Sequence, residues 1–216
     1  GSTLIDMFSK CGSLREAHAV FNSLPQQDVI SWSAIITGYV QHDQHRRAFE
    51  LFKKMLQDGV KPDRVVFLCI LKACSSIGAF NHGKMIHDQI KKCGLDSDVI
   101  VASSLIDMYC KCGTVEDAVC VFDSLPHKDV VMWSAMAAGY AQHGYGEEAL
   151  NYFQQMQNEG ISPNGITMIS ILKVYGSIGD YDKGKKLHDC PWLQSIVLSC
   201  PTIWELHPLS KWDLHN

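Results

Sequence analysis

The sequence lacks the segments and motifs that would indicate a membrane-spanning protein or a known class of enzyme. It has no uninterrupted apolar run of about 18 residues, the length that a membrane-spanning helix needs. It has no P-loop, no G-x-S-x-G and no dinucleotide-binding fingerprint. None of its ten histidines begins the H-x-E motif of zinc deaminases, and no P-C-x-x-C is present. We therefore expect no membrane span, no catalytic residues, no metal site and no cofactor in this chain.

Paired cysteines are also missing. The nine cysteines include no C-x-x-C, and their odd number does not suit a regular disulfide framework. Most of them stand on or beside apolar helical stripes, where a reduced cysteine acts as a small hydrophobic residue. This usage predicts a reducing compartment.

What the sequence does have is a repeat of 101 residues. Residues 1–87 align without a gap with residues 102–188, and 37 of the 87 positions are identical. Trp32-Ser33-Ala34, for example, returns as Trp133-Ser134-Ala135. A gapless match indicates duplicated stacked units, each fixed in length because neighbouring units must pack in register.

Each unit has the pattern of two amphipathic helices. Ala48, Leu51, Phe52 and Met55 fall at i, i+3, i+4 and i+7, and residues 149–156 repeat this apolar stripe. Glycines at 59 and 160, each followed by a proline three residues later, predict helix ends. Glycines at 38 and 139 stand within helices, which indicates that neighbouring helices approach closely there. We expect capping boxes at residues 13–16 and 114–117.

Three motifs alternate along the chain. Leu105-Ile106-Asp107-Met108-Tyr109, Trp133-Ser134-Ala135 and Ile70-Leu71-Lys72-Ala73-Cys74 resemble the short, standard and long motifs of plant pentatricopeptide repeat proteins of the PLS subclass. The resemblance covers about residues 1–188. It implies an all-α fold, a right-handed α-solenoid of stacked helix-turn-helix repeats.

The resemblance also divides the chain. The expected repeats are a short one at 1–28, which is incomplete at its N-terminus, a standard one at 29–63, a long one at 64–98, a short one at 99–129, a standard one at 130–164 and an incomplete long one at 165–188. Residues 189–216 form a divergent tail, because Pro191 would break the helix expected there. We interpret this tail as a foreign ending or a poorly folded cap.

In this family each repeat faces one base of single-stranded RNA, and side chains at the fifth and last positions of the repeat select the base. The resemblance therefore pairs Ser2 with Asp28, Ser33 with Asp63, Leu68 with Asp98, Ser103 with Asp129, and Ser134 with Asn164, while the incomplete repeat offers Ile169 alone. The second positions hold Ile30, Val65, Ile100, Val131 and Ile166. These stiff β-branched side chains are expected to pack against the bases.

The chemistry of these pairs suggests a target. An ionised aspartate only accepts hydrogen bonds, which suits the ring N–H of guanine or uracil, whereas an asparagine also donates, which suits adenine or cytosine. A small hydroxyl at the fifth position goes with purines in the family. Leu68 cannot form a hydrogen bond, so its repeat should discriminate poorly. The prediction is 5′-GGNGAN-3′. The net charge of −4 likewise shifts recognition from phosphates to bases.

Other interpretations stay open at this point. A serine near a helix start, or an aspartate at the end of a unit, also serves as an N-cap, and both roles can coexist in one residue. The leading hypothesis is an RNA-binding module of an RNA editing or processing factor of mitochondria or chloroplasts. Such a factor can also bind editing or processing cofactor proteins, and any catalysis would come from a deaminase domain, called DYW, or a partner outside this chain. The alternatives are a scaffold for protein–protein interaction and a non-functional gene fragment.

Overall fold

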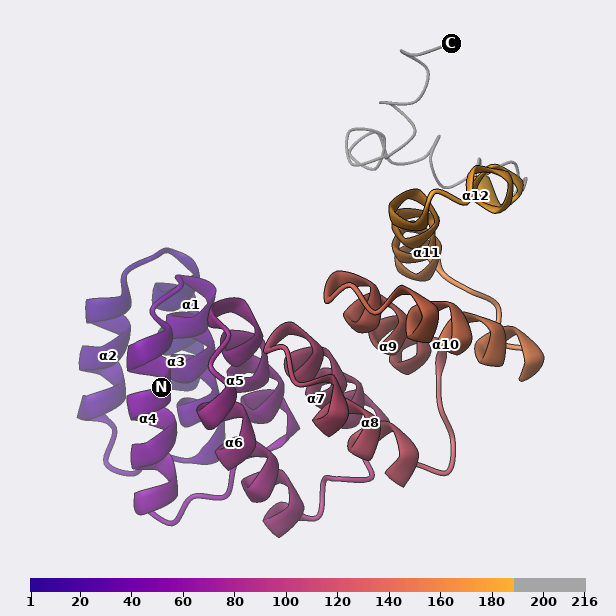
Figure 1. Cartoon of the computed structure of the whole chain (residues 1–216). Helices are drawn as coiled ribbons and strands as arrows, with labels where there is room; N and C mark the ends of the chain where they lie inside the picture. Colours follow the sequence, from indigo (N-terminus) through magenta and orange to yellow (C-terminus); the bar gives the residue numbers. More distant parts are fainter. Residues whose placement is uncertain (189–216) are drawn as a thin grey trace. The chain divides into compact units, whose positions relative to one another are not determined.

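The computed structural model describes residues 1–188, which form twelve α-helices (Figure 1). The helices are α1 (Ser2–Lys10), α2 (Leu14–Ser23), α3 (Val29–Gln41), α4 (His45–Gln57), α5 (Arg64–Ile77), α6 (Phe80–Cys93), α7 (Val99–Lys111), α8 (Val115–Ser124), α9 (Val130–Gln142), α10 (Gly146–Asn158), α11 (Gly165–Ile178) and α12 (Tyr181–His188). Within this part of the chain, none of the helices is long and apolar enough to cross a membrane. The predicted divergent tail lies outside the described residues.

The described part of the chain divides into two compact units, one spanning residues 1–112 and the other beginning at residue 113. In the first unit, α1, α3, α5 and α7 form a row in which each helix packs on the next, and we call this the first-helix row. Each of α2, α4 and α6 packs on the first-helix-row member before it and on the one after it. In the second unit, α9 packs on α11, and α10 contacts both. This stacking of helix pairs confirms the predicted all-α solenoid class.

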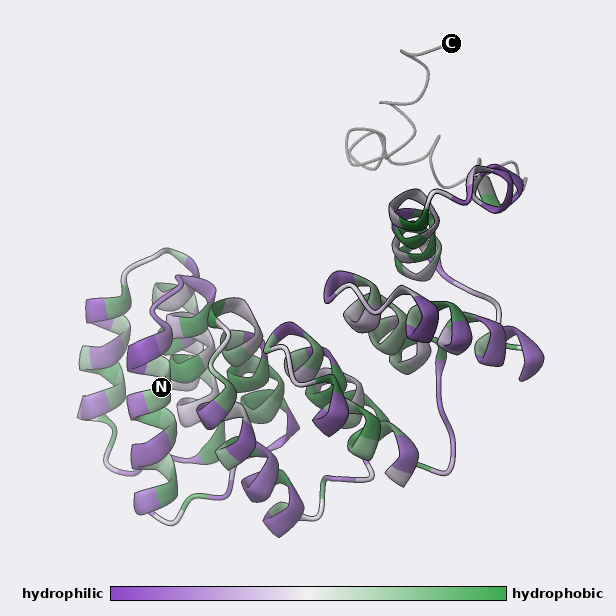
Figure 2. Ribbon diagram, in the orientation of Figure 1, coloured by the Kyte–Doolittle hydropathy of each residue, from purple (hydrophilic) through white to green (hydrophobic). Residues whose placement is uncertain are grey.

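The core of each unit lies where first and second helices meet. Trp32 is fully buried, and its ring meets Phe21 edge to face at 4.6 Å. Trp133 meets Phe122 in the same way at 4.8 Å within the second unit. Hydrophobic residues gather where the helices pack, and hydrophilic residues mark the outward sides of helices such as α4 and α6 (Figure 2). The apolar stripes of the sequence therefore become the contact faces between helices.

Glycine sets one close helix contact and several helix ends. A Cβ atom on Gly38 would lie 2.7 Å from the Cβ of Ser9, so α1 and α3 approach closely at this point, as predicted. Gly59 and Gly160 have φ values of +72° and +74°, and this left-handed conformation closes the ends of α4 and α10 as expected.

The expected capping boxes are wrong. Ser13 and Thr114 occupy the N-cap positions of α2 and α8, but neither side chain forms a capping hydrogen bond. The backbone of Ser13 is already engaged in closing α1, because its N–H donates to the carbonyl of Phe8 at 2.9 Å after the left-handed Gly12. This leaves Ser13 with ψ at 62°, away from the extended conformation of a capping serine.

Candidate nucleic-acid interface

The first helices α3 and α5 each leave a narrow stripe of side chains out of the core. On α3 the stripe contains Ile30, Ser33, Thr37 and Gln41, and none of these side chains is buried. The spacing of three to four residues keeps them on one face of the helix. The corresponding residues of α5 are Val65, Leu68, Lys72 and Ser76. Because α3 and α5 pack side by side, the two stripes form one continuous surface, which we call the stripe surface.

Exposed apolar side chains open each stripe. The second positions of the repeats hold residues with exposed fractions between 49% and 62%, namely Ile30, Val65, Ile100, Val131 and Ile166. An aliphatic side chain that stays in water at the same position of successive repeats marks a surface suited to contact with an apolar or flat partner. Packing against bases stays a prediction for all five.

The last residue of each predicted repeat caps the next first helix. One side-chain oxygen accepts a hydrogen bond from a backbone N–H of the first turn, at 2.8 to 3.1 Å, in Asp28, Asp63, Asp98, Asp129 and Asn164. The capping role that the sequence left open is therefore present. The second side-chain atom forms no hydrogen bond with the helix, so it is the atom best placed for a base-selecting role.

The second atom differs between Asp63 and Asn164. A backbone N–H only donates, so the atom of Asn164 that lies 3.0 Å from the N–H of Thr167 must be its oxygen. The amide nitrogen of Asn164 then points away from the cap and offers two donors. Asp63 caps through Oδ1, and its Oδ2 offers only an acceptor. The ends of the two predicted standard repeats thus present opposite hydrogen-bonding groups at corresponding positions.

The fifth-position serines are less accessible than the sequence suggests. Ser103 and Ser134 are 8% and 2% exposed, and Ser33 is half-buried. Ser103 donates to the carbonyl of Val99 at 2.7 Å, whereas the single hydroxyl hydrogen of Ser134 is shared between the carbonyl of Val130 and the hydroxyl of Thr167, which both lie within hydrogen-bond distance. A hydroxyl bonded to the preceding turn can still accept a hydrogen bond through its oxygen.

Two contacts at this surface were missed from the sequence. The hydroxyl of Thr167 lies 2.8 Å from the hydroxyl of Ser134 and 3.1 Å from Oδ1 of Asn164, so it links the fifth and last positions of one repeat. Arg64 lies 3.5 Å from Oδ2 of Asp98, which engages the second oxygen of that cap. The only sequence signal for the first link is that Thr167 replaces Val66 between the two copies.

Hydrogen bonding keeps one cap carboxylate charged, and burial keeps two core thiols uncharged. Hydrogen bonds from Ser31 hold the pKa of exposed Asp28 below its usual value, so this cap is ionised at neutral pH. Burial raises the pKa of the Cys74 and Cys110 thiols to about 12, which keeps them protonated and weakly nucleophilic. Among the residues that the structure describes, no cluster of His, Cys, Asp and Glu could hold a metal ion.

Comparison with known families identifies the repeats. A model of the PPR repeat family matches residues 27–76 and 128–177, and a PPR repeat model matches residues 2–29 and 100–130. A chloroplastic pentatricopeptide repeat-containing protein of Arabidopsis thaliana is 37% identical over 200 residues, which cover 92% of this chain and 24% of that protein. A mitochondrial one from the same plant is 40% identical over 204 residues, covering 85% of this chain and 23% of that protein. The chain therefore spans about a quarter of the length of these relatives.

Solved structures show the same fold. The crystal structure of the pentatricopeptide repeat protein PPR10 from maize matches 87% of this chain and 28% of its own length, with a TM-score of 0.67 and 24% identity. PPR10 in complex with an 18-nt psaJ RNA element matches 90% of this chain and 30% of its own, with a TM-score of 0.68 and 18% identity. The repeat models, the relatives and the helix pairs agree, and the chain belongs to the pentatricopeptide repeat family.

Proposed function

We propose that this chain is a sequence-selective module for single-stranded RNA, built from short, standard and long repeats of the PLS subclass. The observation that carries the proposal is the opposite hydrogen-bonding chemistry of Asp63 and Asn164, both of which stand beside exposed β-branched residues. A surface that binds any flat partner needs the apolar residues alone. A surface that distinguishes partners needs groups that vary from repeat to repeat.

Each base would stack on one exposed second-position side chain and meet one N-cap at its Watson–Crick edge. Oδ2 of Asp63 accepts from the ring N–H of guanine, and the amide nitrogen of Asn164 donates to a ring nitrogen of adenine. Asp129 would select guanine in the same way as Asp63. Asp98 would select weakly, because Arg64 engages its second oxygen and Leu68 offers no hydrogen bond. The proposed target remains 5′-GGNGAN-3′.

The proposed setting of this module is a chloroplast or a mitochondrion. The two relatives are named chloroplastic and mitochondrial, which supports an organellar RNA editing or processing factor. PPR10 has been solved with a bound RNA element, which supports an RNA partner here. The chain itself would supply recognition rather than catalysis, with cofactor proteins or another domain supplying the chemistry.

A protein-binding scaffold is the second candidate, and the exposed apolar row favours it. Ile30, Val65 and Ile100 belong to successive first helices of one unit, and such a row also suits the apolar face of a peptide. A scaffold would depend on the apolar row but not on the difference between Asp63 and Asn164. The gene-fragment alternative depends on the tail, which lies outside the described residues.

A titration separates the two candidates. The chain is titrated into labelled RNAs that contain GGNGAN and into variants with one purine replaced by a pyrimidine, at a fixed stated salt concentration. Sequence-selective binding predicts the tightest binding for the unaltered RNA, and the largest losses at the bases facing the repeats at residues 29–63 and 130–164. Equal affinity for every RNA, or no binding at low salt, contradicts the proposal.

A further inference from the structure

The charges of the stripes follow the repeat type. We compare the ninth and thirteenth positions of the repeats, counting the incomplete first repeat in register with the second short repeat. These positions hold Asp and Lys in both short repeats, an uncharged pair in both standard repeats, and Lys and Ser in both long repeats. These residues are Asp6 with Lys10, Thr37 with Gln41, Lys72 with Ser76, Asp107 with Lys111, Ala138 with Gln142, and Lys173 with Ser177. Net positive charge at these two positions therefore comes from the long repeats alone.

The lysines of the short repeats are neutralised where they stand. Lys10 lies 2.7 Å from Asp6, and Lys111 lies 2.8 Å from Asp107, each one helical turn away. Lys72 and Lys173 are exposed, and no carboxylate of residues 1–188 forms an ion pair with either of them. An unpaired ammonium group on a surface is available to an anionic partner.

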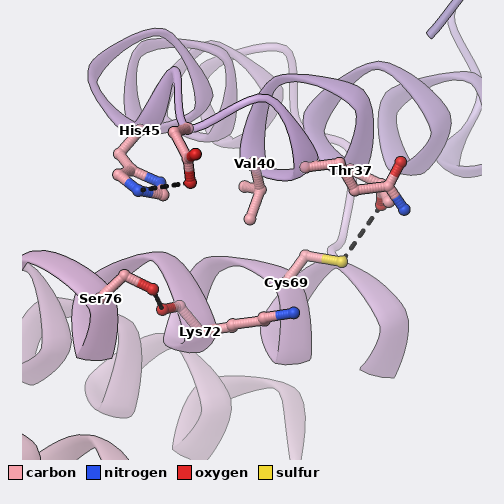
Figure 3. Close-up of a pocket in the computed structure, with 8 residues that line it drawn as sticks. Thr37, Val40, His45, Cys69, Lys72 and Ser76 are labelled. Carbon is pink, nitrogen blue, oxygen red and sulfur yellow. Dashed lines mark hydrogen bonds and ion pairs between the residues drawn. The ribbon is translucent and has the colours of Figure 1, made fainter. Parts of the chain in front are cut away.

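Lys72 also lines a hollow between α3 and α5 (Figure 3). The hollow has a volume of about 260 Å³ and is lined by Thr37, Val40, Gln41, Asp43, His45, Cys69, Lys72 and Ser76. Four of these residues belong to the stripes of α3 and α5, so the hollow opens within the stripe surface. Figure 3 shows Lys72 extending along α5 on the side of the hollow opposite Thr37 and Val40.

Besides Lys72, the lining offers an anion the amide of Gln41 and the imidazole of His45. The two hydroxyls are already engaged, because Ser76 donates to the carbonyl of Lys72 at 2.9 Å and Thr37 lies 3.2 Å from a cysteine sulfur. The Nδ1 atom of His45 is buried and has no hydrogen-bond partner among the described residues, although the imidazole can donate or accept there. The one carboxylate of the lining, that of Asp43, is 92% exposed and lies 3.7 Å from Nε2 of the same histidine.

We propose that this hollow binds a phosphodiester of the RNA backbone, and that long repeats hold the strand while short and standard repeats read its bases. This inference rests on the proposed RNA-binding function. Lys72 stands one turn beyond Leu68, about 6 Å along the helix axis, so its ammonium group lies next to the place where a base would meet the first turn. Leu68 cannot select that base, and the contact from this repeat is therefore independent of sequence.

The test measures affinity as a function of salt. A lysine–phosphate contact releases counterions, so removing one lowers the absolute value of the slope of log affinity against log salt by about 0.7 for a single strand. Lys72→Met should lower this absolute slope by about 0.7 and weaken matched and mismatched RNAs equally, by about fivefold at about 0.1 M salt. Lys72→Arg should keep the slope. Lys91→Met on α6, which removes the same charge outside the stripes, is the control and should also keep it.

A gain of slope provides the opposite test. Asp107→Asn leaves Lys111, at the corresponding position of a short repeat, without its ion pair, and the absolute slope should rise by about 0.7. The phosphate contact is refuted if the chain binds RNA selectively but Lys72→Met keeps the wild-type slope, or if Lys72→Met changes the preference at one base only. The proposed function itself fails if the wild-type chain binds no RNA at low salt, so the two failures are distinguishable.

Discussion

The two predicted standard repeats, residues 29–63 and 130–164, share their scaffold and differ in what they present to a partner. Each buries a tryptophan edge to face against a phenylalanine, Trp32 at 4.6 Å and Trp133 at 4.8 Å. Each ends in a residue that caps the next first helix. At that cap the first repeat has an aspartate and the second an asparagine, and these are equally good N-caps.

This difference shows how the surface can change while the fold does not. A cap requires one oxygen, which Asp63 and Asn164 both supply, and so the second atom is free to vary. Val66 of the first copy and its counterpart Thr167 can also differ without disturbing the packing, because the two side chains are nearly the same size and both are fully buried. The hydroxyl of Thr167 then ties Ser134 to Asn164, whereas in the first repeat Val66 offers Ser33 no such partner.

The largest expected effect tests whether the two scaffolds are equivalent. Trp32→Ala and Trp133→Ala should each lower the free energy of unfolding by about 3–5 kcal/mol, because each leaves a large cavity in a packed core. Urea unfolding followed by circular dichroism measures the loss. Tyr145→Ala, at a side chain that is 48% exposed, is the control and should cost little. If only one of the two tryptophan substitutions lowers the free energy of unfolding by this amount, the two scaffolds are not equivalent.

The next effect concerns the close contact of α1 with α3. Gly38→Ala should lower the free energy of unfolding by about 1–3 kcal/mol, because the new methyl group would overlap Ser9. Helix propensity alone would stabilise the variant by about 1 kcal/mol, so the sign of the change is decisive. Thermal unfolding gives that sign. The double variant with Ser9→Gly should recover the loss, and no recovery would mean that the strain arises elsewhere.

The sequence predicted the scaffold better than the surface, for a physical reason. Buried residues of a helix recur every three to four positions, so apolar stripes can be predicted from the sequence. A close helix contact at a glycine within a helix, such as Gly38, can be predicted in the same way. Side-chain hydrogen bonds depend on the backbone of one turn and on the neighbouring helix. The capping role of Ser13 failed because its N–H closes α1. The pairing of Arg64 with Asp98 joins residues of adjacent helices, and no local pattern indicates it.

Exchange of the caps tests the difference between the repeats directly. Asn164→Asp should move the preference at its base from adenine toward guanine by about tenfold, which corresponds to about 1.4 kcal/mol, because an unmatched donor or acceptor costs about 1–3 kcal/mol. Asp63→Asn should produce the reverse change at the first repeat. Competition between RNAs that differ at one base measures both. Each variant keeps an N-cap oxygen, so its melting temperature should stay close to that of the wild type. A change in melting temperature with no change in base preference would reduce these residues to helix caps.

The smallest effect concerns the hydroxyl link that only the second of the two predicted standard repeats has. Thr167→Val removes the hydroxyl contacts with Ser134 and Asn164 but keeps the backbone cap at 3.0 Å. The amide of Asn164 is then held by one hydrogen bond instead of two, so discrimination at its base should fall about threefold, or about 0.7 kcal/mol. Single-base competition measures this loss.

The reciprocal change, Val66→Thr, should give Ser33 and Asp63 the link they lack and sharpen the preference for guanine by a similar factor. Thr167→Ser is the matched control, because it keeps the hydroxyl and loses only a methyl group. If Thr167→Ser and Thr167→Val weaken discrimination equally, packing of the methyl group explains the effect and the hydroxyl link does not. If only Thr167→Val weakens it, a residue buried beneath the surface tunes the selectivity of the asparagine above it, and the two repeats differ in the strength of their preference as well as in its direction.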